Sequence, residues 1–266
     1  MKIMLMRKQT IAVAAAVCIL LAGVLAVSFA DRAAVVNNNI NGRELPIYRV
    51  RRDDNKIAIS FDAAWGNEDT QDLINILEKY DVKATFFVVG DWVDKYPESV
   101  KALSDAGHEV MNHSDTHPHM TSLSHDEMLK EAEACSEKIS KITGVKPILF
   151  RPPYGDYDNN VISTLFDNGY YSIQWDVDSL DWKELSAQEI TDRVMKDVKS
   201  GSIVLFHNAA LHTPEALPGI IEGLKGKGYE FVKISELIYK DGYNMTVSGE
   251  QYVASSSEKE SPEGEV

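Results

Sequence analysis

The sequence predicts an α/β fold in which parallel strands alternate with helices. Short runs of β-branched and aromatic residues recur through the middle of the chain, and segments with helical spacing separate them. The predicted strands are 56–61, 83–90, 109–113, 148–151, 172–177, 202–207 and 230–234. Strict alternation implies parallel strands joined by helical crossovers, and seven such units imply an open doubly wound sheet or a barrel.

The segments between the strands have apolar residues on one helical face. In the first of them, Leu73, Ile74 and Leu77 share a face. The predicted helices are 69–80, 97–106, 126–143, 159–168, 187–199 and 214–226. Glycine, which readily ends a helix in a left-handed conformation, follows several of these segments. These glycines are Gly107, Gly144, Gly169, Gly201 and Gly228.

Composition limits the class of protein. The 266 residues suffice for one large domain or two small ones. The 27 Lys and Arg against 41 Asp and Glu give a net charge of −14, which argues against a nucleic-acid partner bound by phosphate neutralisation. The two cysteines are Cys18, in the N-terminal apolar run, and Cys135, so the folded part has neither an internal disulfide nor a thiolate metal cluster.

Residues 1–30 have the pattern of an export segment. Lys2, Arg7 and Lys8 precede an apolar run at 11–27, and small residues follow at 28–30. The run is long for a signal-peptide core and short for a span of about 20 residues, so a cleaved signal peptide and a membrane anchor are both open. We expect an extracytoplasmic protein, secreted or anchored at the cell envelope, that touches the membrane only through this segment and is a monomer.

The flanks of the folded part are polar and aperiodic. Residues 31–54 read as a linker, and the predicted domain covers 55–240. Residues 241–266 are predicted to be a disordered acidic tail, because the stretch 248–266 contains five Glu and one Lys among many Ser and Gly.

Ionisable residues stand at the carboxyl ends of the predicted strands. Active sites of parallel α/β folds are built at those ends, so we expect one site there. A single such residue often ends a strand without any function, but the whole set favours a site. The set is Asp62, Asp91, His113, His117, Arg151, Asp176, Asp178, Asp181 and His207.

Three of these side chains suggest metal-assisted hydrolysis. His113 and His117 are four residues apart, and in a helical turn this spacing aims both imidazoles at one divalent metal. The alternative is a capping or core histidine pair. Asp62 follows a buried strand, where its carboxylate can deprotonate a metal-bound water.

Two more side chains supply the remaining roles. The forked guanidinium of Arg151 can hold the base ionised and oriented. His207 is a candidate acid because imidazole titrates near neutrality. Its partner is expected among the acids of the stretch 176–182, and we include Asp178 among the catalytic residues.

Five motifs in order resemble those of the polysaccharide deacetylases, the NodB-homology domain of carbohydrate esterase family 4. They are S-F-D-A-A-W-G at 60–66, H-S-D-T-H at 113–117, R-P-P-Y-G at 151–155, D-V-D-S-L-D-W at 176–182 and I-V-L-F-H at 203–207. The resemblance covers about residues 55–235. The D-A-A-W-G variant of the first motif is most similar to sporulation-type deacetylases. It implies a distorted (β/α)7 barrel and a metal-dependent removal of acetyl from N-acetylglucosamine units of peptidoglycan or chitooligosaccharides.

The resemblance also implies a role for each motif residue. It makes zinc the expected metal, with cobalt, nickel and manganese as alternatives, and its aromatic residues Trp65 and Trp182 suit stacking on sugar. By position the implied roles are Asp62 as base, His113 and His117 as metal ligands, Arg151 as the residue holding the base, Tyr154 as an oxyanion donor through its backbone N–H, and His207 as acid.

One position departs from the family pattern. The first motif of the family usually has two adjacent aspartates, the second a metal ligand, and this chain has Ala63 there. Catalytic zinc usually has three protein ligands, so Asp62, Asp115 or water must fill in, or the metal is bound weakly, or catalysis is lost. A catalytically silent glycan-binding or structural protein of the same fold, and a hydrolase of O-acetyl esters, are the competing functions.

Overall fold

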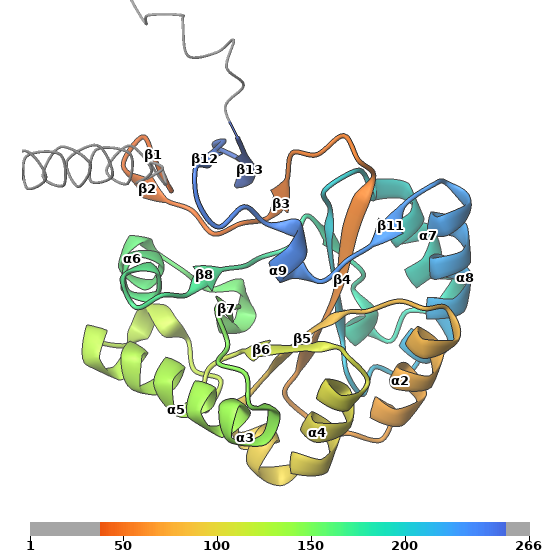
Figure 1. Cartoon of the computed structure of the whole chain (residues 1–266), viewed down its shortest axis with the longest axis horizontal. Coiled ribbons are helices and arrows are strands. Elements are labelled where there is room, and N and C mark those ends of the chain that lie inside the picture. Colours follow the sequence, from red (N-terminus) through yellow and green to blue (C-terminus); the bar gives the residue numbers. More distant parts are fainter. Residues whose placement is uncertain (1–37, 254–266) are drawn as a thin grey trace, which may run out of the picture.

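The computed structural model describes residues 38–253 as a curled parallel sheet with helices on its outer side (Figure 1). Seven strands follow one another across the sheet in the order β8-β7-β6-β5-β4-β10-β9, and β11 pairs with the start of β4. All of these pairings are parallel. The expected distorted (β/α)7 barrel is therefore confirmed, and the doubly wound alternative is not what the chain forms.

The strands of this sheet are short apart from β4. Their bounds are β4 (Lys56–Ala63), β5 (Thr85–Val88), β6 (Glu109–Asn112), β7 (Leu149–Phe150), β8 (Tyr171–Ser172), β9 (Val177–Asp178), β10 (Ile203–His207) and β11 (Glu230–Phe231). The predicted strand 172–177 is divided between β8 and β9, which lie at opposite edges of the sheet.

The predicted helices are present, and two short ones were not predicted. The bounds are α2 (Thr70–Lys79), α3 (Gly90–Lys95), α4 (Pro97–Asp105), α5 (His125–Thr143), α6 (Asn159–Asp167), α7 (Ala187–Asp197), α8 (Thr213–Gly226) and α9 (Ile234–Leu237). A capping box begins α5, in which Ser124 and Glu127 satisfy each other's backbone N–H groups. Gly144, in a left-handed conformation at φ 73°, ends it.

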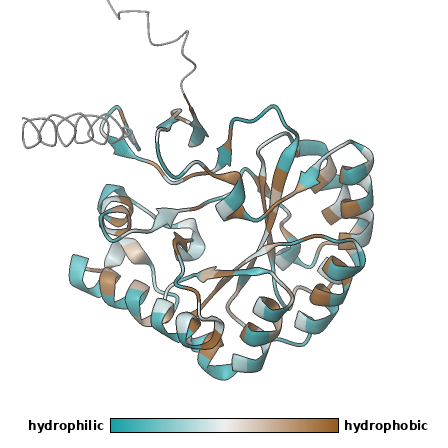
Figure 2. Ribbon diagram, in the orientation of Figure 1, coloured by the Kyte–Doolittle hydropathy of each residue, from teal (hydrophilic) through white to brown (hydrophobic). Residues whose placement is uncertain are grey.

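Apolar residues fill both sides of the sheet. Along β4, Ile57, Ile59 and Phe61 pack in the larger cluster with the outer helices, whereas Ala58 belongs to a second cluster inside the curl. Figure 2 shows the hydrophobic positions concentrated on strands and on helix faces turned towards the sheet. This alternation directs the next inward positions, Ser60 and Asp62, towards the interior.

The ends of the described chain close the curl at its amino-terminal side. The bounds of these extra strands are β1 (Asn39–Ile40), β2 (Arg43–Glu44), β3 (Arg49–Val50), β12 (Asn244–Met245) and β13 (Glu250–Tyr252). Ile47 forms a bridge to Ile173 beside β8, and Val50 donates its N–H to the Gly201 carbonyl before β10. The first segment thus runs from the β8 edge of the open sheet to the start of β10.

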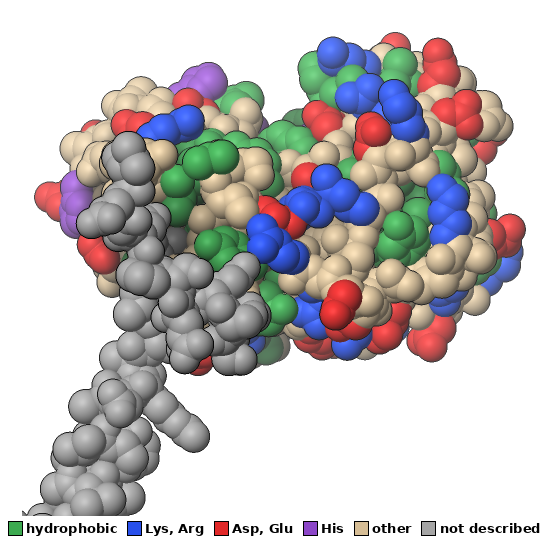
Figure 3. Space-filling model, turned by 90° about the horizontal axis from the view of Figure 1, so that it is seen from above, with side chains coloured by type: hydrophobic (Ala, Val, Ile, Leu, Met, Phe, Trp, Pro, Cys, Tyr) green, Lys and Arg blue, Asp and Glu red, His purple; other side chains and the backbone are tan. Residues whose placement is uncertain are grey.

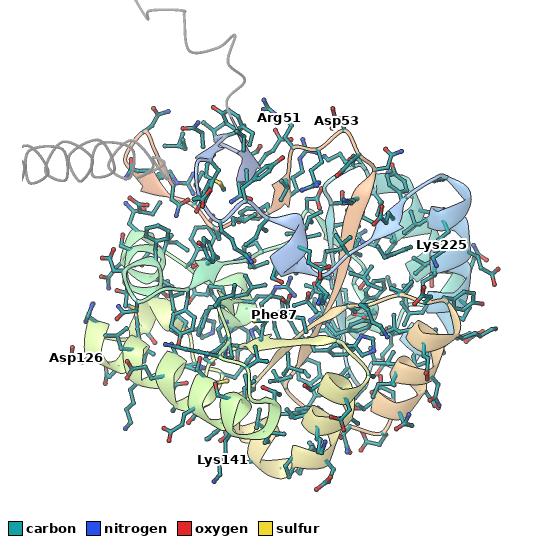
Figure 4. All side chains as sticks on the ribbon, viewed as in Figure 1. Arg51, Asp53, Phe87, Asp126, Lys141 and Lys225 are labelled. Atoms are coloured by element: carbon teal, nitrogen blue, oxygen red, sulfur yellow. The ribbon has the colours of Figure 1, made fainter. Side chains whose placement is uncertain are left out.

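The second segment pairs with the first. β13 runs parallel to β3, and Glu250 forms ion pairs with Arg49 and Arg51. The labelled Arg51 lies beside β13 in Figure 4, and acidic and basic side chains stand side by side on the face seen in Figure 3. Tyr243 and Met245 are 1% and 2% exposed.

These contacts correct two predicted boundaries. The expected linker at 31–54 and the expected disordered tail at 241–266 both contain ordered, buried structure in their described parts, 38–54 and 241–253. The physical reason is that an unclosed sheet leaves apolar surface and strand edges, which these polar-looking segments cover. The predicted signal peptide or anchor at 1–30 lies outside the described residues. Within residues 38–253, no helix has the length and apolar character needed to cross a membrane.

We predict that Met245→Ala lowers the free energy of unfolding by about 2–5 kcal/mol, because a buried methionine side chain is replaced by a cavity. Urea unfolding of both proteins measures the difference. Val247→Ala is the matched control, since Val247 is 71% exposed and its loss should leave stability unchanged. Equal midpoints for all three proteins would mean that 241–253 behaves as a tail.

Candidate functional site

Strand order brings the predicted site residues together. β10, β4, β5, β6 and β7 are consecutive neighbours, so their carboxyl ends form one rim. His207 pairs directly with Asp62 in the register of β10 and β4. His113 follows β6, and Arg151 follows β7. Asp91 also follows a strand, but it lies exposed in α3 away from the group.

A cavity of about 520 Å³ opens at this rim. Most of the predicted site residues line it, whereas Arg151 is buried and, like Asp91, Asp176 and Asp181, is not part of the wall. The lining residues are Asp62, Ala64, Trp65, His113, His117, Tyr154, Gly155, Trp175, Asp178, Trp182, Leu205 and His207. A cavity of this size accommodates a small ligand or one sugar unit of a polymer.

Arg151 holds Asp62 ionised. The Arg151 side chain is fully buried, and its Nη1 lies 2.6 Å from Asp62 Oδ1. Its Nη2 donates to Ser60 Oγ at 2.9 Å and to the Gln174 carbonyl at 3.2 Å. Burial raises the pKa of Asp62, but the charge and hydrogen bond of Arg151, together with His113 and His207, outweigh it and hold that pKa below the usual range. Asp62 Oδ2 remains directed to the histidine side, 3.5 Å from His113 Nε2.

His113 presents one specific nitrogen to the cavity. Its Nδ1 lies 2.6 Å from the Arg151 carbonyl oxygen, and because a carbonyl only accepts, Nδ1 carries the proton. The lone pair of neutral His113 is therefore on Nε2, which lies 3.3 Å from His117 Nε2. Burial lowers the pKa of both imidazoles, that of His117 to about 4, so both are neutral near pH 7.

The two imidazoles fit a divalent metal. Two ligands about 2.0–2.1 Å from a tetrahedral ion lie about 3.3 Å apart, which is the separation of these two nitrogens. A backbone carbonyl that fixes the other ring nitrogen is also typical of histidine ligands. The third protein ligand is missing, because Ala63 is 1% exposed and packs in the apolar cluster. Within the described range 38–253, no three His, Cys, Asp or Glu side chains are grouped to hold a metal ion.

His207 has the opposite electrostatic environment. Its Nδ1 lies 2.8 Å from Asp181 Oδ1, and its backbone N–H donates to Asp181 Oδ2 at 2.8 Å. Thr213 Oγ1 also donates to Oδ2, at 2.7 Å. Burial lowers the pKa of His207, but the hydrogen bond to Asp181 and the charge of Asp62 outweigh it, so the pKa is raised. The imidazolium form is therefore favoured. Because Nδ1 is bound to Asp181, Nε2 is the ring nitrogen that can reach a ligand in the cavity.

The partner of His207 is Asp181 and not Asp178. Asp178 lines the cavity, but its carboxylate accepts the Leu180 N–H at 2.9 Å. Asp176 is bound to Ser202 and the Ile203 N–H, on the amino-terminal side of β10. The sequence offers three acids in seven residues without distinguishing them. Their separation depends on the left-handed Leu180, which turns the chain and directs Asp181 under His207.

Aromatic side chains form the rim of the cavity. Trp65 and Trp182 are 48% and 52% exposed, and the Trp65 indole stacks on the His207 ring at 5.8 Å. Tyr154 is 62% exposed, with a left-handed backbone at φ 61°. Its ring stacks on the His119 ring, with the two centroids 4.3 Å apart.

Comparisons with known proteins place this site in a family. Residues 49–173 match the polysaccharide deacetylase family. The peptidoglycan-N-acetylmuramic acid deacetylase PdaC of Bacillus subtilis is 38% identical over 181 residues, which are 68% of this chain and 38% of that protein. A peptidoglycan-N-acetylglucosamine deacetylase of Bacillus cereus is 32% identical over 186 residues, 68% of each chain. The chain thus spans well under half the length of the first of these relatives.

Solved structures agree on the fold. A Bacillus anthracis protein described as a family 4 carbohydrate esterase pseudoenzyme is 36% identical, with a TM-score of 0.71, and the match covers 79% of this chain and 73% of that one. A mutant of it, described as having restored enzymatic activity, is 39% identical with a TM-score of 0.69 over 72% of this chain and 70% of that one. With the motifs, the fold and the identity to the Bacillus cereus protein, the chain belongs to the polysaccharide deacetylase family.

Proposed function

We propose that this chain is a metal-dependent hydrolase that removes N-acetyl groups from N-acetylglucosamine-containing glycan of the cell envelope, in peptidoglycan or chitooligosaccharide form. The observation that carries this proposal is one cavity with an ionised carboxylate, Asp62, and an imidazole of raised pKa, His207, each held by its own buried partner. Hydrolysis of an amide needs a base for water and an acid for the leaving amine, and these two groups have the matching charge states.

His113 and His117 would hold the metal, with zinc expected and cobalt, nickel or manganese as alternatives. The bound metal would polarise the acetyl carbonyl and lower the pKa of the attacking water. Around it, Asp62 accepts the proton of that water while Arg151 keeps its carboxylate ionised. The Tyr154 backbone N–H is the proposed oxyanion donor, because it belongs to the turn that lines the cavity.

His207 completes the proposed reaction. Its Nε2 donates a proton to the departing amine, so that water and the acetamide become acetate and a free amino sugar. Trp65 and Trp182 stand exposed at the cavity rim, where flat indoles suit stacking on sugar rings. Asp178 is proposed to act as a carboxylate of the cavity wall that faces the substrate.

The proposed location follows from the substrate. The named relatives act on peptidoglycan, which lies outside the cytoplasmic membrane. We therefore propose extracytoplasmic action, secreted or anchored through residues 1–30. Sporulation as the context, the monomeric state and the absence of nucleic-acid partners stay predictions from the sequence.

A second candidate is a catalytically silent glycan-binding protein. Ala63 favours it, because the usual carboxylate ligand is absent, and so does the similarity to a protein described as a pseudoenzyme. Acetate release from peptidoglycan and chitooligosaccharides separates the two functions. The enzyme proposal requires release that a chelator stops and added zinc or cobalt restores. Glycan binding without acetate under every metal condition would establish the silent alternative.

We predict that His113→Ala and His117→Ala each abolish stoichiometric metal binding, because one imidazole leaves too few protein ligands. Elemental analysis of dialysed protein measures the content, and His125→Ala, whose side chain is 56% exposed on the surface, is the control. Ala63→Asp should raise metal affinity by restoring a carboxylate. Unchanged metal content in both histidine variants would place the metal elsewhere.

We predict that Asp62→Asn lowers turnover by about 10²–10⁴-fold while metal stays bound, because the amide cannot take a proton from water. Metal content and acetate release are measured on the same preparation, together with thermal unfolding, since the change leaves Arg151 buried beside a neutral group. An inactive protein that has also lost its metal would show that Asp62 is a ligand and not the base.

We predict that Asp181→Asn lowers the pKa of His207 and moves the alkaline limb of the rate profile to lower pH. The folded pKa is raised by the Asp181 carboxylate, so activity that needs imidazolium is present below this pKa and lost as pH rises through it. Asp178→Asn, which removes a charge without a hydrogen bond to His207, is the matched control and should shift less. Titration of the His207 ring by NMR checks the shift without turnover, and an equal shift in both variants contradicts the pairing.

A further inference from the structure

We infer that Glu131 of helix α5 is the positioning residue that sets His117 against His113. The inference rests on the proposed function insofar as these imidazoles hold a metal. The residues concerned are the turn 113–117, which connects the end of β6 to the segment before α5, and the face of α5 packed against it. In Figure 4, Asp126 and Lys141 mark the two ends of this helix.

The turn has an unusual backbone. Ser114 and His117 have φ values of 68° and 60°, which residues with a side chain rarely adopt. Such conformations persist only when surrounding contacts fix them. His113 itself is independently held, since its N–H donates to the Val88 carbonyl and its ring to the Arg151 carbonyl. His117 is therefore the imidazole whose position depends on the turn.

Helix α3 and strand β6 form hydrogen bonds with some of the backbone groups of the turn. The Gly90 N–H donates to the Ser114 carbonyl and the Asp91 N–H to the Asp115 carbonyl, each at 2.9 Å. The Ser114 N–H donates to Asn112 Oδ1 at 2.8 Å. The His117 N–H donates to Ser114 Oγ at 3.0 Å, inside the turn.

Glu131 takes the remaining donors. Its Oε2 accepts the Asp115 N–H at 2.9 Å and the Thr116 N–H at 2.8 Å. Its Oε1 accepts the Thr116 hydroxyl at 2.8 Å. Both successive N–H groups point at one carboxylate in this conformation of the turn, so the bonds favour it. Hydrogen bonds to an ionised acceptor are also the stronger kind.

A second contact from α5 fixes the outside of the turn. Lys138 lies 2.6 Å from Asp115 Oδ1 and 2.7 Å from Asp94 Oδ2. The Asp115 carboxylate lies so close to Gly90 that a Cβ there would come within 1.9 Å of Oδ1. Lys138 contacts the Asp115 side chain, whereas Glu131 accepts the N–H groups of Asp115 and Thr116, the two residues directly before His117. Glu131 is thus the contact of α5 that bears on the imidazole separation of 3.3 Å.

Four versions of the full chain test the inference: wild type, Glu131→Ala, Glu131→Gln and Glu137→Ala. Alanine removes every acceptor but suits a helix, so folding should survive, as thermal unfolding will check. Glutamine keeps one oxygen for the two N–H groups and serves as the rescue. Glu137 is exposed on the same helix and serves as the matched control of charge.

The first measurement needs no metal. Hydrogen exchange of the His117 amide is followed in metal-free protein, because its acceptor is Ser114 Oγ and not Glu131. We expect at least tenfold faster exchange in Glu131→Ala, and exchange close to wild type in Glu131→Gln and Glu137→Ala. Unchanged protection at His117 in Glu131→Ala overturns the inference.

The second measurement titrates Zn²⁺, and Co²⁺ for its visible absorption. Loss of an outer contact to a ligand typically costs 10–100-fold in metal affinity, and we expect this loss in Glu131→Ala, recovery in Glu131→Gln and none in Glu137→Ala. Equal affinity in wild type and Glu131→Ala overturns the inference. If wild type binds neither ion, the metal-site proposal fails, and the exchange measurement alone decides the role of Glu131.

Discussion

Arg151 and Asp62 form an ion pair at the floor of the cavity, and the rest of the site is arranged around the cost of burying it. Removing two charges from water is costly, and hydrogen bonds to their other polar groups offset part of that cost. Nη2 of Arg151 donates to Ser60 Oγ and to the Gln174 carbonyl, and the Phe87 ring lies 4.2 Å from the guanidinium carbon, whereas Nε has no hydrogen-bond partner among the described residues. Phe87 is labelled in the middle of Figure 4, inside the curl of the sheet. These partners come from β4, β5 and the segment that follows β8, so the strand order determines where the charge can stand.

The three histidines of the cavity lie on two sides of Asp62 and differ in the direction of their pKa shifts. Buried His113 and half-buried His117 lie beside each other, where desolvation lowers the pKa of both imidazoles and keeps them neutral. His207 lies on the other side of Asp62 with a carboxylate of its own, so its pKa moves upwards. One side-chain type thus provides neutral imidazoles and an imidazole of raised pKa in the same cavity, because the charges within a few ångströms differ. Strands β6 and β10, which are separated in the sheet by β5 and β4, carry these histidines at their carboxyl ends.

Ala63 changes one element of this arrangement and leaves the others in place. The ion pair, the His207–Asp181 pair and the two imidazoles all remain, although glycan binding needs none of them. Ala63 is 1% exposed and its methyl group has no donor atom, so the position offers the histidine pair no ligand. The charged pairs of the cavity therefore do not depend on a carboxylate at position 63.

Local sequence determined the alternation of strands and helices, because apolar periodicity reports which face of each element is buried. It also determined which side chains meet at the rim, since residues after parallel strands share one edge of the sheet. The buried structure of segments 38–54 and 241–253 could not be predicted in this way. These segments have no apolar periodicity, and they are buried because they cover the open part of the sheet. Asp181 could not be distinguished from Asp178 in the sequence for a similar reason: the partner of His207 depends on the single left-handed residue Leu180.

In the sequence, Glu131 is one more acidic residue on an amphipathic helix. Only the packing of α5 against the turn at 114–117 gives its carboxylate three donors, because contacts between residues distant in sequence are decided by tertiary structure.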